Sequence, residues 1–323
     1  MQIPKPVQKI VKTLQDKGFK AYIVGGCVRD LLRNVKPQDW DVATNAKPDQ
    51  TTVLFPRTFA DNKFGTVAVV TNSNDPTLKS IEITPFRIES RYTDKRHPDE
   101  VAWVETIEQD LARRDFTVNA MAAALTEPKL KVKSGKLKIE IIDPFDGQKD
   151  LQNKLIRAVG KPAERFEEDA LRLIRAVRFA ITLGQGWQIE TETKLAIKEK
   201  ASLLDYISKE RVRDELCKII MTERAMEGIE LLRQLGLLCR IIPELEEGYG
   251  VGQNKHHIYD CYEHSLRSLD YAAKKGFNLY VRLAALLHDI AKPRVKQGQG
   301  PNSTFYNHEV VGARMVRDIL GRL

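Results

Sequence analysis

The stretch VGGCVRDLLRNVKPQDWDVAT, residues 24–44, decides how the first part of the chain is expected to fold. A short apolar run, AYIV at residues 21–24, has the character of a strand and ends at Gly25 and Gly26. Glycines at a strand-to-helix turn let backbone N–H groups approach a phosphate, and the N-terminus of the next helix adds a favourable dipole. Arg29 lies one turn into that helix, where its guanidinium can make a bidentate phosphate contact. This order of residues indicates a phosphate-binding turn.

Two aspartates follow the turn, one residue apart, at Asp39 and Asp41. We expect residues 39–42 to form a second strand, in which alternate side chains share a face, so both carboxylates point the same way. Two carboxylates on one face are costly unless a cation lies between them, and Mg²⁺ prefers oxygen ligands together with substrate phosphates. Taken singly, a Gly-Gly pair is usually a turn and an Asp-x-Asp pair a solvated strand end. In this order and within about twenty residues, they predict a metal-dependent nucleotide site.

The rest of the first part predicts a mixed sheet with helices, the α+β class. Glu82 alternates with apolar residues on an expected strand. It could supply a third carboxylate to the site, or it could be a side chain that faces solvent. The strands over 64–70 and 81–84 could lie beside the Asp-x-Asp strand in an antiparallel sheet. Helices are expected over residues 1–20, ended by Gly18, over 29–34 and from 47, and a strand-turn at 141–147 closes this part.

The length and composition of the chain limit the number of domains and the kinds of partner that are expected. Its 323 residues are too many for one ordinary core, so two or three domains are expected. Lys plus Arg exceeds Asp plus Glu by 52 − 44 = 8, which suits a phosphate-rich partner. The four cysteines are widely spaced, which indicates a reducing cytosol and neither a disulfide framework nor a zinc knuckle. The amphipathic start does not read as a signal peptide, and no apolar run approaches the length of a membrane span.

Two charged segments lie in the middle of the first part. Residues 87–105 break helical periodicity and predict a mobile loop, either functional or a solvated linker. The string DLARRDFTVNAM, residues 110–121, follows it. Its aspartates, Asp110 and Asp115, could simply pair with neighbouring arginines on a helix surface.

From about residue 151 the pattern becomes almost entirely helical, and its key segment is ERFEEDALRLIRAVRF at 164–179. Four charged residues recur every third position on one slowly rotating face, while apolar residues occupy another. A surface ladder of ion pairs would give this pattern. So would base recognition, because a carboxylate accepts from the exocyclic amine of cytosine or adenine and a guanidinium donates to the neighbouring ring acceptor. Uracil and guanine present their hydrogen-bond donors and acceptors in the opposite order. The four residues are Asp169, Arg172, Arg175 and Arg178.

The last third carries a second group of chemically active side chains. His288-Asp289 follows an apolar helix, and His264 and His308 lie on either side of it. Imidazole and carboxylate together suit a divalent transition metal. A hydrogen-bonded pair at a helix end is the alternative for His288-Asp289.

These motifs, in this order, resemble those of the polymerase-beta superfamily of nucleotidyltransferases. Within it, the chain resembles the bacterial class II tRNA nucleotidyltransferases (CCA-adding enzymes) and the related bacterial poly(A) polymerases. The resemblance implies that Asp39 and Asp41 hold two Mg²⁺ ions, roughly 3.5–4 Å apart. It also implies roles for residues of the later motifs. Arg114 contacts the nucleotide, Asn119 shapes the sugar pocket, Asp169 and Arg172 read the base, Arg175 and Arg178 support the nucleotide, and residues 210–220 form a structural neck helix.

The implied reaction is template-independent addition of CCA to the 3′ end of tRNA from CTP and ATP. The segment 87–105 is similar to the flexible loop linked to the switch from C to A, which favours full CCA addition. The acceptor end would be recognised by shape, phosphates and 2′-hydroxyls. Poly(A) polymerases and specialised CC-adding or A-adding enzymes are the alternatives. A non-catalytic RNA-binding protein is disfavoured, because simple stem binding gives metal-binding carboxylates no role.

The last third is similar to the HD metal-dependent phosphohydrolases, which implies a possible second divalent-metal site at His264, His288, Asp289 and His308. Phosphoester hydrolysis is therefore a more distant alternative function. We expect a head domain over 1–147, a helical nucleotide-selecting and RNA-binding neck over 148–222, and a helical body over 223–323. The pattern stops mid-helix at Leu323, and a complete relative is expected to continue with more helices.

Overall fold

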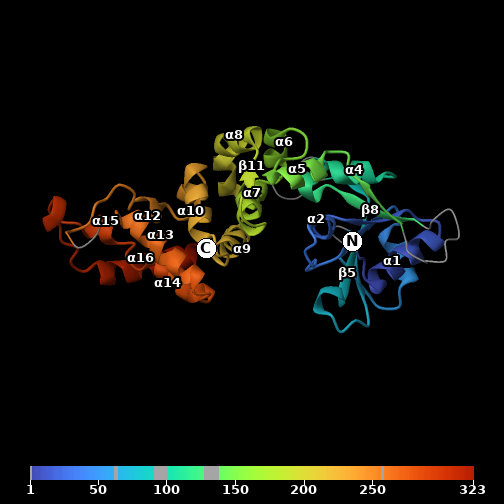
Figure 1. Cartoon of the computed structure of the whole chain (residues 1–323), viewed down its shortest axis with the longest axis horizontal. Helices are drawn as coiled ribbons and strands as arrows, with labels where there is room; N and C mark the ends of the chain where they lie inside the picture. The colour runs from blue at the N-terminus through green and yellow to red at the C-terminus, as the bar shows by residue number, and fades with distance from the viewer. Residues whose placement is uncertain (1, 62–64, 91–99, 127–137, 256–257) are drawn as a thin grey trace. The chain divides into compact units, whose positions relative to one another are not determined.

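The computed structural model describes residues 2–61, 65–90, 100–126, 138–255 and 258–323. Contacts divide the chain into two compact units, the first ending at Lys161 and the second beginning at Pro162 (Figure 1). The first unit contains a large sheet and the second is almost entirely helical. The predicted α+β head followed by helical parts is therefore confirmed, while the finer division into neck and body stays a prediction.

Within the described residues, the first unit is built on a seven-stranded sheet with strand order β3-β4-β5-β2-β1-β8-β9. β1 pairs antiparallel with β2 and β8, and β4 with β5, but β2 and β5 run parallel. The predicted antiparallel placement beside the Asp-x-Asp strand is therefore wrong in direction. A parallel crossover needs a long connection, which helix α3 (Pro48–Leu54) and strands β3 and β4 provide. The strands of this sheet are β1 (Ala21–Val24), β2 (Asp41–Thr44), β3 (Thr58–Asp61), β4 (Thr66–Val70), β5 (Ser80–Pro85), β8 (Ala122–Thr126) and β9 (Lys138–Ile142).

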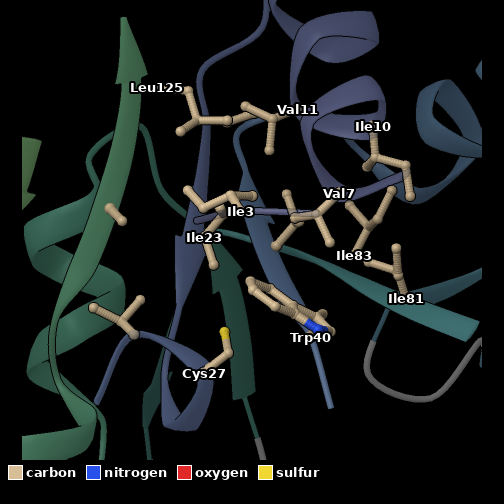
Figure 2. Packing of buried hydrophobic residues seen from close by; sticks show 14 of the residues in the cluster. Ile3, Val7, Ile10, Val11, Ile23, Cys27, Trp40, Ile81, Ile83 and Leu125 are labelled. Atoms are coloured by element: carbon tan, nitrogen blue, oxygen red, sulfur yellow. The ribbon is translucent and has the colours of Figure 1, made fainter. Parts of the chain in front are cut away.

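Helix α1 covers one face of this sheet. Its apolar stripe packs against alternate residues of the strands and against Trp40 (Figure 2). The helix spans Lys5–Asp16, shorter than the predicted 1–20, because Pro4 and Pro6 fix its start. Gly18, with φ of 84°, ends it as predicted. The stripe consists of Val7, Ile10, Val11 and Leu14, all of them buried.

The opposite face carries its own core, so the central strand β1 is apolar on both sides. Ile23 packs into the cluster with α1, whereas Val24 packs with Phe86 and Leu111 on the other side. The short run AYIV, at residues 21–24, is explained by this double burial. The remaining helices of the unit are α2 (Gly26–Leu32), α3 (Pro48–Leu54), α4 (Ile107–Ala112) and α5 (Gly147–Asn153), and β10 is Leu155–Ile156.

The structure corrects three further boundaries. Helix α2 begins at Gly26, not at residue 29, and a left-handed Asn34 lies just after it. Strand β2 begins at Asp41, so Asp39 lies in the bend before it. The segment predicted as a loop over 87–105 contains two strands, which pair antiparallel, with Arg87 opposite Trp103. Residues 91–99 of that segment lie outside the described residues. The two strands are β6 (Arg87–Ser90) and β7 (Glu100–Trp103).

The second unit is a series of short helices, as the pattern predicts, although β11 (Gln188–Ile189) interrupts them. The helices α7, α9 and α10 pack on one another, and α10 and α14 pack on α13. None of the helices in the described residues is long and apolar enough to cross a membrane. The helices are α6 (Pro162–Glu168), α7 (Leu171–Thr182), α8 (Thr191–Lys200), α9 (Lys209–Ile220), α10 (Ala225–Gln234), α11 (Leu238–Ile241), α12 (Pro243–Glu246), α13 (Cys261–Lys274), α14 (Leu279–Leu287), α15 (Lys292–Val295) and α16 (His308–Arg322).

Candidate active site and candidate metal cluster

The turn between β1 and α2 requires glycine at position 25. Gly25 has φ of 79° and ψ of −140°, a conformation that residues with a side chain rarely adopt. A Cβ atom there would lie 2.8 Å from Arg114 Nη1 and 3.6 Å from Asp41 Oδ2. The backbone of the turn therefore approaches a guanidinium and a carboxylate at van der Waals distance. Three residues predicted from separate motifs are brought together at this point.

The paired aspartates lie beside this turn. Trp40 between them is buried in the α1 core, at 3% exposed, which turns the two flanking carboxylates away from that core. Asp41 lies opposite Glu82 in the parallel pairing of β2 with β5. Burial raises the pKa of Asp41 to about 6, and repulsion from Asp39 and Glu82 adds to the effect while Arg114 opposes it. The cluster therefore holds more negative charge than Arg114 offsets.

Arg114 enters this site from the residues after α4. Its Nη2 is 3.2 Å from Asp110 Oδ2, and Arg113 Nη2 is 2.8 Å from Asp110 Oδ1. Asp110 is fully buried, so the pairing is not on a helix surface as the simpler interpretation of the sequence would have it. Among the described residues, the buried Nε of Arg114 has no hydrogen-bond partner. A buried donor without an acceptor is costly, which makes this N–H a candidate for binding an anion.

Arg29 and Asn119, both predicted to bind nucleotide, contact each other directly. Arg29 Nη1 donates to Asn119 Oδ1 at 2.7 Å, and Arg29 Nε and Nη2 donate to Asp30 at 2.9 Å. Asn119 Nδ2 in turn donates to Asp115 Oδ1 at 3.2 Å. Both side chains are therefore oriented by the protein before any ligand binds. A phosphate at Arg29 would have to exchange with Asp30 or share the guanidinium with it.

The donor set at Asp39 and Asp41 fits a Mg²⁺ ion. Both residues supply carboxylate oxygens, the ligand type that Mg²⁺ prefers, and few protein ligands leave room for substrate phosphates. The raised pKa of Asp41 indicates a site that a cation would stabilise. Glu82, on the neighbouring strand, is exposed and is placed to act through charge.

In the second unit, the residues predicted to read the base lie at the junction of α6 and α7. Asp169 falls in the break between the two helices, and its Oδ1 accepts from the N–H of Leu171 at 3.1 Å. Arg172 is buried, at 8% exposed, and its Nη1 is 2.7 Å from Glu168 Oε2. Glu168 also pairs with Arg165. These contacts hold Asp169 and Arg172 in defined orientations, one at the start of α7 and one in its first turn.

The other two arginines of the row lie further along α7. Arg178 pairs with Glu215 of α9, a carboxylate that is 3% exposed. Burial raises the pKa of Glu215, but Arg178 and Lys218 outweigh it and lower the pKa below its ordinary value. The guanidinium of Arg178 stacks 3.8 Å from the ring centroid of Phe179, and that of Arg175 lies 5.4 Å from the same ring.

The four residues of the HD-like pattern come together at the junction of α13, α14 and α16. His264 Nε2 and His288 Nε2 are 3.0 Å apart, and each lies 3.1 Å from Asp289 Oδ2. His308 Nε2 lies 3.6 Å from Asp289 Oδ1. Ligand atoms of the first three lie within 4.8 Å of one another, a spacing at which they could hold a metal ion. The resemblance to the HD phosphohydrolases grouped these residues, and their role as metal ligands stays a prediction.

Backbone contacts of this cluster suit metal binding. His288 Nδ1 is 3.0 Å from the carbonyl of Ala285, and His308 Nδ1 is 2.7 Å from that of Phe305. A proton on Nδ1 leaves Nε2 as the ligand atom, facing Asp289 in both cases.

A lysine already contacts the same carboxylate. Lys292 Nζ is 2.7 Å from Asp289 Oδ2 and 2.8 Å from Gln253 Oε1, and the lysine is 7% exposed. Burial raises the pKa of Asp289, but His288 and Lys292 outweigh it and lower the pKa well below its ordinary value. The hydrogen bond to Asp289 raises the pKa of His288.

The sequence interpretation missed the side chains that orient the predicted ones. Glu168 lies four residues before Arg172 and Lys292 three residues after Asp289, so helical spacing could have found both. Gln253 and Glu215 approach from elements distant in the sequence. No local pattern signals contacts of that kind.

Three family models match parts of the chain. Residues 21–157 match the family described as "Poly A polymerase head domain". Residues 186–248 match "Probable RNA and SrmB- binding site of polymerase A", and residues 261–323 match "HD domain". These matches place the chain among proteins that combine a poly(A) polymerase head domain with an HD domain.

Individual relatives that match the chain are CCA-adding enzymes. The chain is 41% identical to a CCA-adding enzyme of Geobacillus sp. (strain WCH70), over 86% of this chain and 63% of that protein. It is 42% identical to one of Lactococcus lactis subsp. lactis (strain IL1403), over 75% of this chain and 56% of that protein. The crystal structure of the Bacillus stearothermophilus CCA-adding enzyme in complex with CTP has a TM-score of 0.66 and 30% identity. That match covers 99% of this chain and 69% of the solved chain.

The chain belongs to the family of bacterial tRNA nucleotidyltransferases (CCA-adding enzymes) and poly(A) polymerases. It spans between about half and two thirds of the length of the curated relatives named above.

Proposed function

We propose that this chain catalyses template-independent addition of CCA to the 3′ end of tRNA, with CTP and ATP as substrates. The observation that carries the proposal is the head site. The Gly25 turn, the Asp41 carboxylate and the Arg114 guanidinium meet there, with excess negative charge and an unsatisfied N–H of Arg114. A nucleoside triphosphate accompanied by a divalent cation supplies what this site lacks. The similarity to CCA-adding enzymes supports the same assignment.

In the proposed reaction, the tRNA 3′-hydroxyl attacks the α-phosphate of the nucleotide and pyrophosphate leaves. The turn at Gly25 and Gly26 and the guanidinium of Arg29 hold the triphosphate. Arg114 donates to a phosphate or sugar oxygen, and Asn119, held by Arg29 and Asp115, shapes the sugar pocket. Asp39 and Asp41 would hold two Mg²⁺ ions, which stabilise negative charge on the attacking and leaving oxygens.

Base selection is assigned to Asp169 and Arg172. The carboxylate accepts from the exocyclic amine of C or A, and the guanidinium donates to the adjacent acceptor. Uracil and guanine place a carbonyl oxygen where the carboxylate needs a donor. Arg175 and Arg178 support the nucleotide. Glu168 contributes by holding Arg172 at 2.7 Å.

A stepwise primer-extension assay tests the proposal. Four tRNA transcripts, ending before the CCA sequence or after its first, second or third nucleotide, are each incubated with Mg²⁺ and one labelled nucleotide. We expect addition of C, C, A and then nothing. The variant Asp41→Asn is expected to lose all three additions, whereas Asp16→Asn, an exposed aspartate at the end of α1, keeps them.

Each other outcome overturns the proposal in a distinct way. Unlimited addition of A to any RNA 3′ end would identify a poly(A) polymerase. Incorporation of C alone, or of A alone, would identify a specialised tRNA nucleotidyltransferase. Tight tRNA binding without incorporation would leave the chain as an RNA-binding scaffold.

A second candidate activity, metal-dependent phosphoester hydrolysis, is favoured by the cluster around Asp289. Two imidazole nitrogens converge on one carboxylate oxygen, a donor set that suits a divalent transition metal. Hydrolysis of p-nitrophenyl phosphate with Mn²⁺ or Ni²⁺, lost in His264→Ala, would support it. Activity that survives this substitution would refute it.

A further inference from the structure

A single residue of α9 reaches the carboxylate that is proposed to read the base. Arg211 Nη2 lies 3.2 Å from Asp169 Oδ2, and its Nη1 lies 3.5 Å from Asp169 Oδ1. The N–H of Leu171 donates to the same Oδ1 at 3.1 Å. Three donors thus fix both oxygens of Asp169 and the plane of its carboxylate. The side chains of Asp169 and Arg211 are 18% and 28% exposed, so the carboxylate remains partly accessible.

Helix α9 is well placed to act as a support. Its apolar residues Val212, Leu216 and Ile219 are buried, which fixes the helix against its neighbours. Arg211 and Glu215 are one helical turn apart and so lie on the same face. Glu215 holds Arg178 in the way that Arg211 holds Asp169. One face of α9 therefore orients both ends of the charged row that begins before α7.

We infer that Arg211 is a positioning residue for base selection, an inference that rests on the proposed function. An ionised carboxylate offers only acceptors, which match the amine of C or A and not the carbonyl oxygen of U or G. This discrimination requires the carboxylate to stay at the base edge. A displaced carboxylate would leave room for a water molecule, which can donate to a carbonyl oxygen. Arg211 enforces the position without touching the base.

The alternative is that Arg211 only braces the unit. A brace would affect protein stability and the use of every nucleotide by a similar factor. A positioning residue changes the ratio between nucleotides. The ratio of the dissociation constants of CTP and UTP therefore separates the two roles, since it is not changed by a uniform loss of folded protein.

The test compares Arg211→Met and Arg211→Lys with Arg213→Met. Arg213 lies on the same helix, is about half exposed and pairs with Asp214, so it controls for removal of a cation from α9. Equilibrium dissociation constants for CTP, ATP and UTP are measured with Mg²⁺, together with thermal unfolding. We expect Arg211→Met to raise the dissociation constants of CTP and ATP roughly tenfold, which corresponds to the loss of one charge-assisted hydrogen bond. The dissociation constant of UTP should stay nearly unchanged. In primer extension, KM for CTP should rise more than kcat falls, and UMP misincorporation should increase.

Arg211→Lys should recover part of the preference, because an ammonium keeps the charge but lacks the planar fork. Arg213→Met should match the wild type. An unchanged CTP/UTP ratio in a folded Arg211→Met protein would overturn the inference while leaving the proposed function intact. If Arg211→Met does not fold, an unchanged ratio in Arg211→Lys overturns the inference in the same way. A wild-type protein that binds CTP and UTP equally would overturn both the inference and the proposed function.

Discussion

The chain contains two carboxylates that the sequence predicts as metal ligands, Asp41 in the head and Asp289 in the helical unit, and their electrostatic states are opposite. Burial and the repulsion of Asp39 and Glu82 raise the pKa of Asp41 to about 6. The pKa of Asp289 is lowered, because His288 and Lys292 outweigh the effect of its burial. The head site thus has a surplus of negative charge, whereas the HD-like cluster already contains a cation.

This difference teaches that similar ligand types do not imply a similar need for metal. Asp41 gains stabilisation from an added cation, because Arg114 alone does not offset the charge of the three carboxylates. At Asp289, an incoming ion must compete with the ammonium of Lys292, 2.7 Å away. We therefore expect the head to depend strongly on a divalent ion and the cluster to bind one more weakly.

The largest expected effect separates the two sites by activity. The double variant Asp39→Asn/Asp41→Asn should lose CMP incorporation by at least about a hundredfold, because charge stabilisation at the reacting oxygens is lost. The double variant His288→Ala/Asp289→Asn should instead lose any phosphoester hydrolysis. Both activities are measured on both proteins, and circular dichroism checks their folding. If each double variant lost both activities while folded, the two sites would not be independent.

The next effect concerns stability at Asp289. Replacing it by Asn leaves the ammonium of Lys292 without its carboxylate, and breaking such a buried pair costs about 3–5 kcal/mol. Because the pKa of Asp289 is lowered in the folded state, its contribution is present above about pH 4 and is lost as pH falls further. Urea unfolding at pH 7 measures the loss. Asp205→Asn, which removes an exposed partner of Arg240, should change stability by less than about 1 kcal/mol.

The same substitution in the head should act in the opposite direction. A raised pKa means that the folded state keeps its proton longer than the unfolded state, so stability falls as pH rises from about 4 through 6. Asp41→Asn removes this cost and should stabilise the divalent-free protein at pH 7 by up to roughly 3 kcal/mol. Urea unfolding from pH 4 to 8 should show the gap between variant and wild type widening up to pH 6. A variant less stable than the wild type at pH 7 would contradict the proposed charge surplus.

The smallest effect should come from Glu82. Its charge is the weakest of the contributions that raise the pKa of Asp41. Glu82→Gln is therefore expected to lower the midpoint of Asp41 by less than about one pH unit. Asp39→Asn should lower it further. A larger shift from Glu82→Gln than from Asp39→Asn would reverse the order of the two neighbours.

Much of the head was predictable from the sequence because its signals are local. The Asp-x-Asp pattern predicted that Asp39 and Asp41 lie near each other, and the charge of Asp39 does act on Asp41, although the strand begins only at Asp41. Gly18 gave the end of α1 through its left-handed conformation. The parallel pairing of β2 with β5 could not be predicted, because apolar alternation is the same for either strand direction.

The residues of the sites were likewise predictable only where the signal is local. His264, His288 and Asp289 were grouped because a His-Asp pair after an apolar helix, with a further His on either side, resembles the HD pattern, and their ligand atoms do lie close together. The contact of Arg211 with Asp169 joins residues 42 positions apart, and the burial of Asp110 depends on packing around it. Neither the contact nor the burial can be predicted from a local sequence pattern, because both arise only when distant elements pack.

The most direct test is a carboxylate titration by NMR on divalent-free protein with ¹³C-labelled aspartate, with Asp41→Asn and Asp289→Asn used to assign the two signals. We predict a midpoint near 6 for Asp41, and an Asp289 that stays ionised at the lowest pH at which the protein is folded. Adding Mg²⁺ should lower the midpoint of Asp41, while Asp289 stays ionised over the same pH range with or without Mg²⁺. An Asp41 midpoint close to the ordinary value of 3.8, without response to Mg²⁺, would contradict the proposal that the head is built around a missing positive charge.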